Sequence, residues 1–154
     1  MKHQLIFLGR FKEPYIAKGV TEYLSRLEHY TTVVITTLKE KKSRRGGQGG
    51  PAGEGAQLLG AVTPGAFLIV LDATGQQFSS KAFAERISQL EQRGIRQVSY
   101  LIGGPEGHSQ EVLARADLLL SLSAMTFPHD LARLLLAEQL YRAYTIKAGE
   151  QYHK

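Results

Sequence analysis

Strand-like and helix-like patterns of apolar and polar positions replace one another in regular order along this chain. Short runs of apolar or β-branched residues, typical of strands, occur at 4–8, 31–38, 66–71, 98–102 and 118–122. Between them, apolar residues recur at helical spacing, which predicts helices from Pro14, at about 52–62, from Ser79 or Ser80 to Gly94, from Ser109, and from Pro128 to about Ile146. This alternation predicts an α/β fold with a mostly parallel sheet flanked by helices.

The segment Lys39–Gly65 is an exception to this alternation. Residues 44–51 read RRGGQGGP, a composition that cannot pack a core and predicts a flexible loop. Five of the nineteen lysines and arginines fall between Lys39 and Arg45. They suit contacts with nucleic-acid phosphates, and the cations that we expect to bind RNA are Lys41, Lys42, Arg44 and Arg45. The alternative is a patch that serves only solubility.

Composition limits the class of protein. The chain has 154 residues, of which 43% are hydrophobic and 21% charged, as expected for one globular domain over residues 1–154. It has no cysteine, which excludes disulfides, thiolate metal sites and cysteine nucleophiles, and we expect no metal. It has no apolar run of 18 residues and no signal-peptide pattern, so we expect a cytoplasmic protein without a membrane partner. The net charge of +5 favours a polyanionic partner.

The last predicted helix has apolar residues around most of its circumference. They are Leu131, Leu134, Leu135, Leu136, Leu140, Tyr141 and Tyr144. A surface helix has one apolar stripe, so this helix must be covered on more than one side. A second copy of the chain, forming a homodimer, is the favoured cover, and a central position within the monomer is the alternative.

Residues 101–107, LIGGPEG, take the chain from a predicted strand into a glycine-rich loop. Ligands bind at the carboxyl ends of strands in open α/β sheets, and glycines let a ligand approach the backbone. The spacing is not that of a dinucleotide site, and Glu106 would repel a pyrophosphate. The loop therefore suits a neutral or cationic ligand, unless it is only a tight turn.

Two further strand ends have residues that suit the same pocket. The loop Ser121–His129, SLSAMTFPH, offers hydroxyls, small residues and two bulky apolar groups, which suit an adenine. The segment 70–75, VLDATG, is placed to close the pocket. Met125 and Phe127 alone would more often belong to a core.

Few ionisable groups lie where they could do chemistry. His129 stands at the start of the last helix, and Glu138 precedes Arg142 by four residues, the spacing of a helical ion pair. Tyr152 and His153 belong to a tail that would be a frayed end if no site lay near it.

Several of these motifs together resemble one family. Residues 101–107 (LIGGPEG), 121–129 (SLSAMTFPH) and 138–143 (EQLYRA), with the Tyr152–His153 ending, resemble the bacterial ribosomal RNA large-subunit methyltransferase H family of SPOUT-class enzymes. The resemblance covers essentially the whole chain. It implies a C-terminal deep trefoil knot and a homodimer whose sites are built from both subunits. It also implies methyl transfer from S-adenosylmethionine to N3 of a pseudouridine in helix 69 of 23S rRNA, within the assembled ribosome.

The resemblance also implies site residues. The cofactor would be bound by Leu71, Gly103, Gly104, Gly107, Ser123, Ala124, Met125, Thr126, Phe127 and Pro128. The Arg44–Gly53 stretch is richer in glycine than the family pattern.

The chemistry of a uracil ring assigns roles to the ionisable groups. The weakly acidic N3 proton must leave, and a histidine is the economical base, with His129 the first candidate and His153, from the facing subunit, the second. Arg142 would stabilise charge on the ring oxygens, and Tyr152 would stack on or orient the base.

Two other functions remain open from the residues alone. A non-catalytic RNA-binding module would use only the cations, and a nucleotide-binding enzyme acting on a soluble metabolite would use only the strand-end pocket. A methyltransferase acting on RNA uses both.

Overall fold

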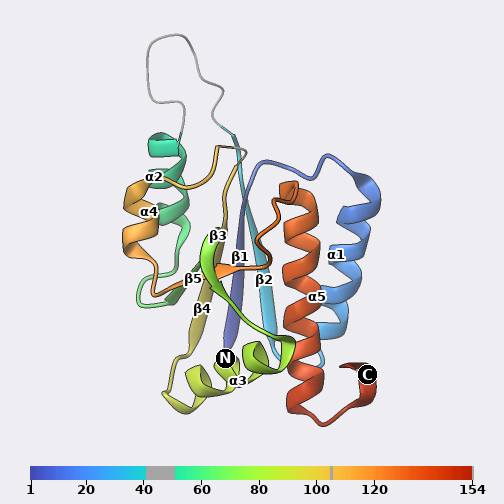
Figure 1. Cartoon of the computed structure of the whole chain (residues 1–154). Helices are drawn as coiled ribbons and strands as arrows, with labels where there is room; N and C mark the ends of the chain where they lie inside the picture. Colours follow the sequence, from blue (N-terminus) through green and yellow to red (C-terminus); the bar gives the residue numbers. More distant parts are fainter. Residues whose placement is uncertain (41–50, 105, 154) are drawn as a thin grey trace.

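The computed structural model describes residues 1–40, 51–104 and 106–153 (Figure 1). The strands are β1 (Lys2–Leu8), β2 (Thr32–Leu38), β3 (Phe67–Gln77), β4 (Gln97–Ile102) and β5 (Leu118–Ser121). The helices are α1 (Pro14–Leu27), α2 (Pro51–Ala61), α3 (Ser80–Gln92), α4 (Gln110–Arg115) and α5 (His129–Lys147), followed by the 3-10 turn η1 (Gln151–His153). The predicted order of elements is confirmed. The predicted glycine-rich loop with Lys41, Lys42, Arg44 and Arg45 lies outside the described residues.

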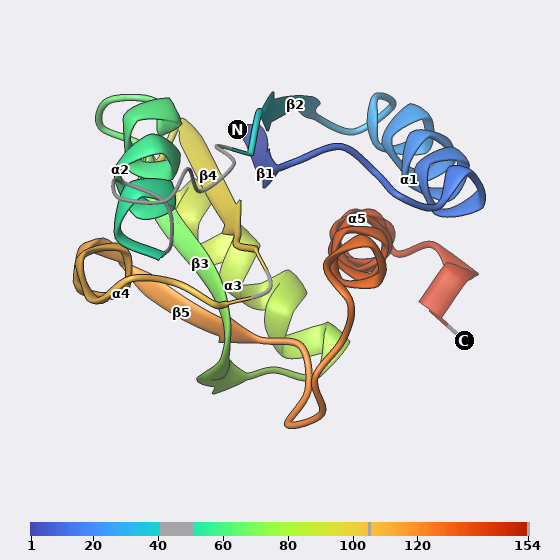
Figure 2. The ribbon, with the colours of Figure 1, turned by 90° about the horizontal axis from the view of Figure 1, so that it is seen from above.

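The five strands form one parallel sheet in the order β2-β1-β4-β3-β5. β4 is the central strand, and β1 beside it pairs with β2 and β4, so that Leu5 lies between Ile35 and Tyr100. The connections β1–α1–β2 and β3–α3–β4 run towards the β2 edge of the sheet, and their helices lie on one face. The connections β2–α2–β3 and β4–α4–β5 run towards the β5 edge, and their helices lie on the other face (Figure 2). Right-handed crossovers require this arrangement, and the predicted parallel α/β sheet is confirmed.

The core has two parts because the side chains of a strand alternate between the faces of the sheet. Leu5 and Phe7 of β1 pack with α1, α3 and α5 on one face. Ile6 and Leu8 pack with α2 and α4 on the other. The continuous apolar runs in the sequence therefore mark strands that are covered on both faces.

Strand β3 extends beyond the predicted boundary at residue 71. Its pairing with β5 is interrupted between Leu71 and Gln76, where the backbone N–H of Thr74 donates to Asp72 Oδ1 at 2.9 Å. Gly75 crosses close to β5, and a Cβ there would lie 2.6 Å from the carbonyl oxygen of Leu119. The sequence prediction was too short because the residues after the interruption are polar and mostly exposed.

Helix α5 is largely buried within the monomer. It packs against α1, α3 and the sheet, and its buried side chains include Leu136, Leu140 and Tyr144. Leu131 and Leu135 remain partly exposed. The alternative of a central helix thus explains most of its apolar circumference. No helix within the described ranges is long and apolar enough to cross a membrane. The trefoil knot stays a prediction.

Candidate cofactor site

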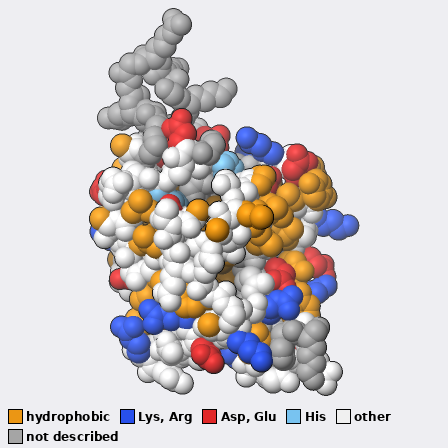
Figure 3. Space-filling model, viewed as in Figure 1, with side chains coloured by type: hydrophobic (Ala, Val, Ile, Leu, Met, Phe, Trp, Pro, Cys, Tyr) orange, Lys and Arg blue, Asp and Glu red, His pale blue; other side chains and the backbone are white. Residues whose placement is uncertain are grey.

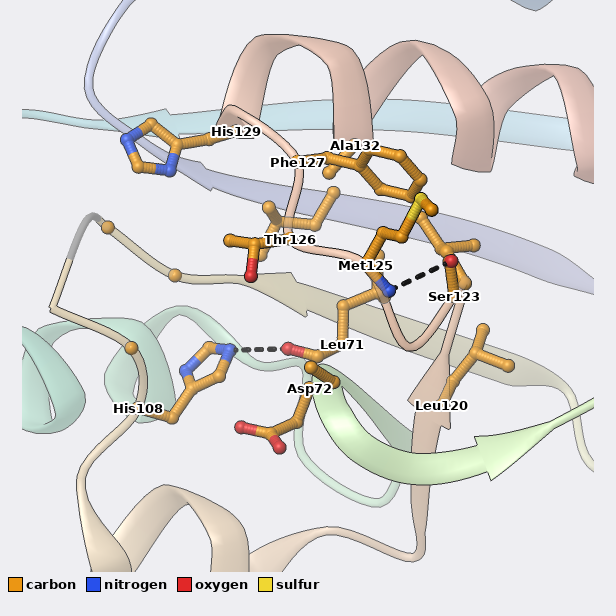
Figure 4. A pocket seen from close by; sticks show the side chains of 16 residues that line it. Leu71, Asp72, His108, Leu120, Ser123, Met125, Thr126, Phe127, His129 and Ala132 are labelled. Atoms are coloured by element: carbon orange, nitrogen blue, oxygen red, sulfur yellow. Dashed lines mark hydrogen bonds between the residues drawn. The ribbon is translucent and has the colours of Figure 1, made fainter.

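A cavity of about 280 Å³ opens at the carboxyl ends of β3, β4 and β5 (Figure 4). Parallel strands end at the same edge of a sheet, so the three loops singled out in the sequence meet here. The residues that line it are Leu71, Asp72, Ala73, Ile102, Gly103, Gly104, Gly107, His108, Leu120, Leu122, Ser123, Met125, Thr126, Phe127, His129 and Ala132. The structure therefore brings together eight of the ten expected cofactor residues. Ala124 and Pro128 belong to the same loop but do not line the cavity.

The glycine loop after β4 forms a tight turn. The backbone N–H of Gly107 donates to the carbonyl of Gly104 at 3.1 Å, and Gly107 has a φ of 76°, which favours glycine. A Cβ at Gly104 would lie 3.3 Å from Glu54 Oε2. The turn thus presents bare backbone to the cavity.

Hydrogen bonds of its own serines fix the conformation of the loop after β5. Ser121 Oγ donates to the carbonyl of Ser123 at 2.9 Å, and Ser123 Oγ accepts from the backbone N–H of Met125 at 3.0 Å. Met125 is 76% exposed beside the cavity, where a flexible thioether can adapt to an aromatic ligand. Leu120, Leu122 and Phe127 supply the apolar wall.

One carboxylate lines the cavity and a second lies beside its glycine turn. Asp72 lines the cavity, and Glu54 reaches Gly104 from α2. Partial burial raises the pKa of Glu54, and the neighbouring negative charges of Glu106 and Glu40 raise it further. The negative charge of Glu106 thus acts on Glu54, although Glu106 itself is exposed.

Two histidines line the cavity, and the sequence indicated only one of them. His129, at the start of α5, is half-buried, and its pKa is lowered by burial first and then by the charges of Arg133 and Lys12. His108 comes from the loop between β4 and α4, and its Nε2 lies 3.1 Å from the carbonyl oxygen of Leu71. The position of His108 directly after the glycine loop was the available indication, but a loop sequence does not fix where a side chain points.

A buried ion pair of Arg133 and Asp130 lies next to His129 in α5. Arg133 is 1% exposed, and its Nη2 donates to the carbonyl of Leu8 at 2.6 Å. Asp130 Oδ2 accepts from the backbone N–H groups of Lys12 and Glu13 at 2.8 and 3.0 Å. These contacts fasten the start of α5 to the loop after β1, so His129 stands on a rigid element.

The other expected catalytic residues lie at the far end of α5. Arg142 follows His129 by thirteen residues, which in a helix corresponds to about 20 Å. Arg142 pairs with Glu138, as the spacing predicted, and stacks over Tyr152 with 4.8 Å from its Cζ to the ring centre. Tyr152 packs on Tyr141 and is not part of a frayed end. The side chain of His153 lies outside the described part of the structure.

Within the described ranges, no group of three or more His, Asp or Glu side chains is arranged to hold a metal ion.

A parallel sheet with a small apolar cavity at its strand ends, bare glycine backbone and a carboxylate in the lining is typical of an α/β protein that binds a nucleoside-containing cofactor.

Comparison with known proteins gives the family. The family described as "Predicted SPOUT methyltransferase" matches residues 1–153. A protein of Desulfotalea psychrophila called "Ribosomal RNA large subunit methyltransferase H" is 54% identical, with both chains covered in full. Proteins of the same name from Pelotomaculum thermopropionicum and Trichlorobacter lovleyi are 43% and 44% identical, over 96% or more of each chain. The chain belongs to the SPOUT methyltransferase family and is a methyltransferase.

S-adenosylmethionine, the methyl donor of this family, fits the residues of the cavity. The apolar wall around Phe127 suits its adenine, and Gly103, Gly104 and Gly107 line the cavity without side chains. The carboxylate of Asp72, which lines the cavity, suits its cationic sulfonium and ammonium groups.

Proposed function

We propose that this protein methylates N3 of a pseudouridine in helix 69 of 23S rRNA within the assembled ribosome, and that it acts as a homodimer. The observation that supports the proposal is the cavity between three strand ends with His129 on its rim. The names of the relatives support a ribosomal RNA substrate. A ribosomal substrate also favours a cytoplasmic location, and the match over residues 1–153 favours a single domain.

S-adenosylmethionine supplies an electrophilic methyl group on a sulfonium. His129 accepts the N3 proton of the substrate ring as N3 attacks the methyl group. The lowered pKa of His129 keeps its imidazole neutral and able to take a proton at neutral pH. His153 is the second candidate for this base. Lys41, Lys42, Arg44 and Arg45 bind RNA phosphates.

Arg142 and Tyr152 act on the substrate of a second copy of the chain. Within one chain Arg142 lies about 20 Å along α5 from His129, with Tyr152 packed against it, too far to share a substrate ring with His129. A twofold dimer with antiparallel α5 helices brings the Arg142 end of one copy to the His129 end of the other. Arg142 then stabilises negative charge on the ring oxygens, and Tyr152 stacks on the base.

An apolar groove beside α5 supports this dimer. A cavity of about 390 Å³ lies between α3 and α5, lined by Phe78, Phe83, Leu135 and Gln139 among others. Leu122 and Phe127 line both this groove and the cofactor cavity, so a second copy seated in the groove would adjoin the cofactor. Figure 3 shows hydrophobic side chains gathered over the upper part of α5.

Mass spectrometry of helix 69, from ribosomes incubated with S-adenosylmethionine with and without this protein, tests the function. We expect a methyl group on the pseudouridine only when the protein is present. Calorimetry with S-adenosylhomocysteine separates the alternatives, because a non-catalytic RNA-binding module would not bind it. An enzyme acting on a soluble metabolite would leave the RNA unchanged.

Single-turnover methylation by the separate variants His129→Ala and His153→Ala tests the base. We expect a loss of about 100-fold or more for the variant that lacks the base. Unchanged rates in both variants would contradict a histidine base.

A further inference from the structure

The cavity lies where β3 parts from β4. The pairing of β3 with β4 ends at Val70 and Leu101, and its pairing with β5 is interrupted after Leu71 and Leu120. Beyond this point the ladder no longer joins β3 to β4, whereas the pairing of β3 with β5 resumes at Gln76. A contact outside the ladder is needed to set the separation between the ends of β3 and β4.

His108 bridges this opening. Its Nε2 lies 3.1 Å from the carbonyl oxygen of Leu71 on β3, although His108 itself follows the glycine loop of β4 (Figure 4). A carbonyl oxygen can only accept, so Nε2 must carry a hydrogen and donate it. Burial lowers the pKa of His108, with the Leu71 hydrogen bond and the Asp72 charge acting in the opposite direction. The ring is therefore neutral at neutral pH, with its proton on Nε2.

The ring of His108 also occupies the space beside Gly103. A Cβ on Gly103 would lie 2.8 Å from Cε1 of the ring, so the glycine leaves room for the imidazole. His108 thus touches the end of β3 through its hydrogen bond and the end of β4 through its ring. Both strand ends line the cofactor cavity.

An imidazole fills the space beside Gly103 at a greater free-energy cost than an aliphatic side chain would. Its Nδ1 is buried and has no hydrogen-bond partner among the described residues. An unpaired buried acceptor costs free energy that an aliphatic side chain of similar size would avoid. The Nε2 donor is the feature of His108 that an aliphatic residue could not supply.

We infer that His108 is a positioning residue of the cofactor cavity, which holds the ends of β3 and β4 at the separation that receives S-adenosylmethionine. This inference rests on the proposed function only for the identity of the cofactor. His108 acts through Leu71 and Gly103 and takes no part in proton transfer. Its loss should therefore weaken cofactor binding and leave the methyl-transfer step intact once the cofactor is bound.

The test compares His108→Leu, which keeps the bulk and removes the donor, with His108→Gln, whose amide nitrogen can take the place of Nε2. Calorimetry with S-adenosylhomocysteine should show affinity about ten-fold weaker for His108→Leu and within about three-fold of the unchanged protein for His108→Gln. At saturating S-adenosylmethionine, the single-turnover rate of both variants should stay within about three-fold. His29→Leu, at an exposed histidine, is the control for loss of an imidazole and should bind as tightly as the unchanged protein.

Unchanged affinity in His108→Leu would overturn the inference, and so would equal losses in the Leu and Gln variants. Nitrogen NMR of the unaltered protein gives an independent measurement: the His108 ring should be protonated at Nε2 and its resonances should shift with S-adenosylhomocysteine. A ring protonated at Nδ1 would overturn the inference. If the unaltered protein binds no S-adenosylhomocysteine, the proposed function and this inference both fail, whereas the preceding outcomes overturn the inference alone.

Discussion

The hydroxyl of Tyr152 donates a hydrogen bond to Glu138 Oε1 at 3.1 Å and so fastens the C-terminal turn to α5. The same oxygen accepts from Arg142 Nε at 2.9 Å, and Glu138 Oε2 accepts from Gln139 at 2.7 Å. One carboxylate therefore orients both of the groups proposed to meet the substrate base. Burial and the bonds to Tyr23 and Glu138 raise the pKa of Tyr152, which keeps its hydroxyl protonated as a donor.

Glu138→Gln should lower methylation without changing cofactor affinity. The variant weakens the charge-assisted bonds that orient Arg142 and Tyr152, and we expect single-turnover rates to fall roughly ten-fold. Glu22→Gln is the matched control, because Glu22 makes the same i, i+4 pair with Arg26 on an exposed part of α1. A loss of S-adenosylhomocysteine affinity in Glu138→Gln would contradict a role of these residues that is confined to the substrate base.

Mixing two inactive variants tests the composite site. In a mixed dimer of His129→Ala and Arg142→Ala, one site lacks both groups and the other has both intact. Mixed dimers make up half of the population after exchange, so we expect roughly a quarter of the unmixed activity to return. Methylation by the mixture, measured against each variant alone, gives the answer. No recovery despite confirmed subunit exchange would place both residues in the site of one chain.

Stability should fall in mild acid because of His3. Its ring is fully buried, with Nδ1 3.1 Å from the Tyr100 hydroxyl and Nε2 2.7 Å from that of Tyr144. Burial first, and then the positive N-terminus and Lys147, lower its pKa to about 3 from the ordinary 6.5. Below the ordinary pKa of 6.5, His3 is protonated in the unfolded chain but stays neutral in the folded protein.

The free energy of unfolding should therefore fall from about pH 6.5 towards pH 3, by up to about 5 kcal/mol from this group. Urea unfolding at a series of pH values measures it. His3→Gln should show a shallower decline, whereas His29→Gln, at an exposed histidine, should decline like the unaltered protein. Parallel curves for all three proteins would rule out His3 as the cause.

Gly75→Ala should destabilise the sheet edge beside the cavity. Its new Cβ would meet the backbone of Leu119 at 2.6 Å, and backbone cannot move aside without breaking the β3–β5 pairing. We expect a loss of about 2 kcal/mol in urea unfolding. Gly60→Ala is the control: nothing lies within 4 Å of its Cβ in α2, so it should be neutral or stabilise by up to about 1 kcal/mol. Equal effects of the two substitutions would refute the close approach at Gly75.

The hydrophobic pattern was sufficient to predict the order of elements and the convergence of three strand ends. Apolar runs and helical spacings identify strands and helices directly, and the expected helix starts at Ser79 and Ser109 are confirmed as N-caps. Parallel strands necessarily end at one edge, so Leu71, Gly103 and Phe127 could be assigned to one pocket before any coordinates. The predicted Glu138–Arg142 pair follows equally from helical spacing alone.

Only the tertiary structure decided which side chains meet across the strands. The reach of His108 to Leu71, the burial of Arg133 behind His129 and the extension of β3 to Gln77 have no periodic pattern in the sequence. Local patterning reports which face of an element is buried, whereas the direction of a loop side chain and the partner of a buried charge depend on packing between segments far apart in the chain.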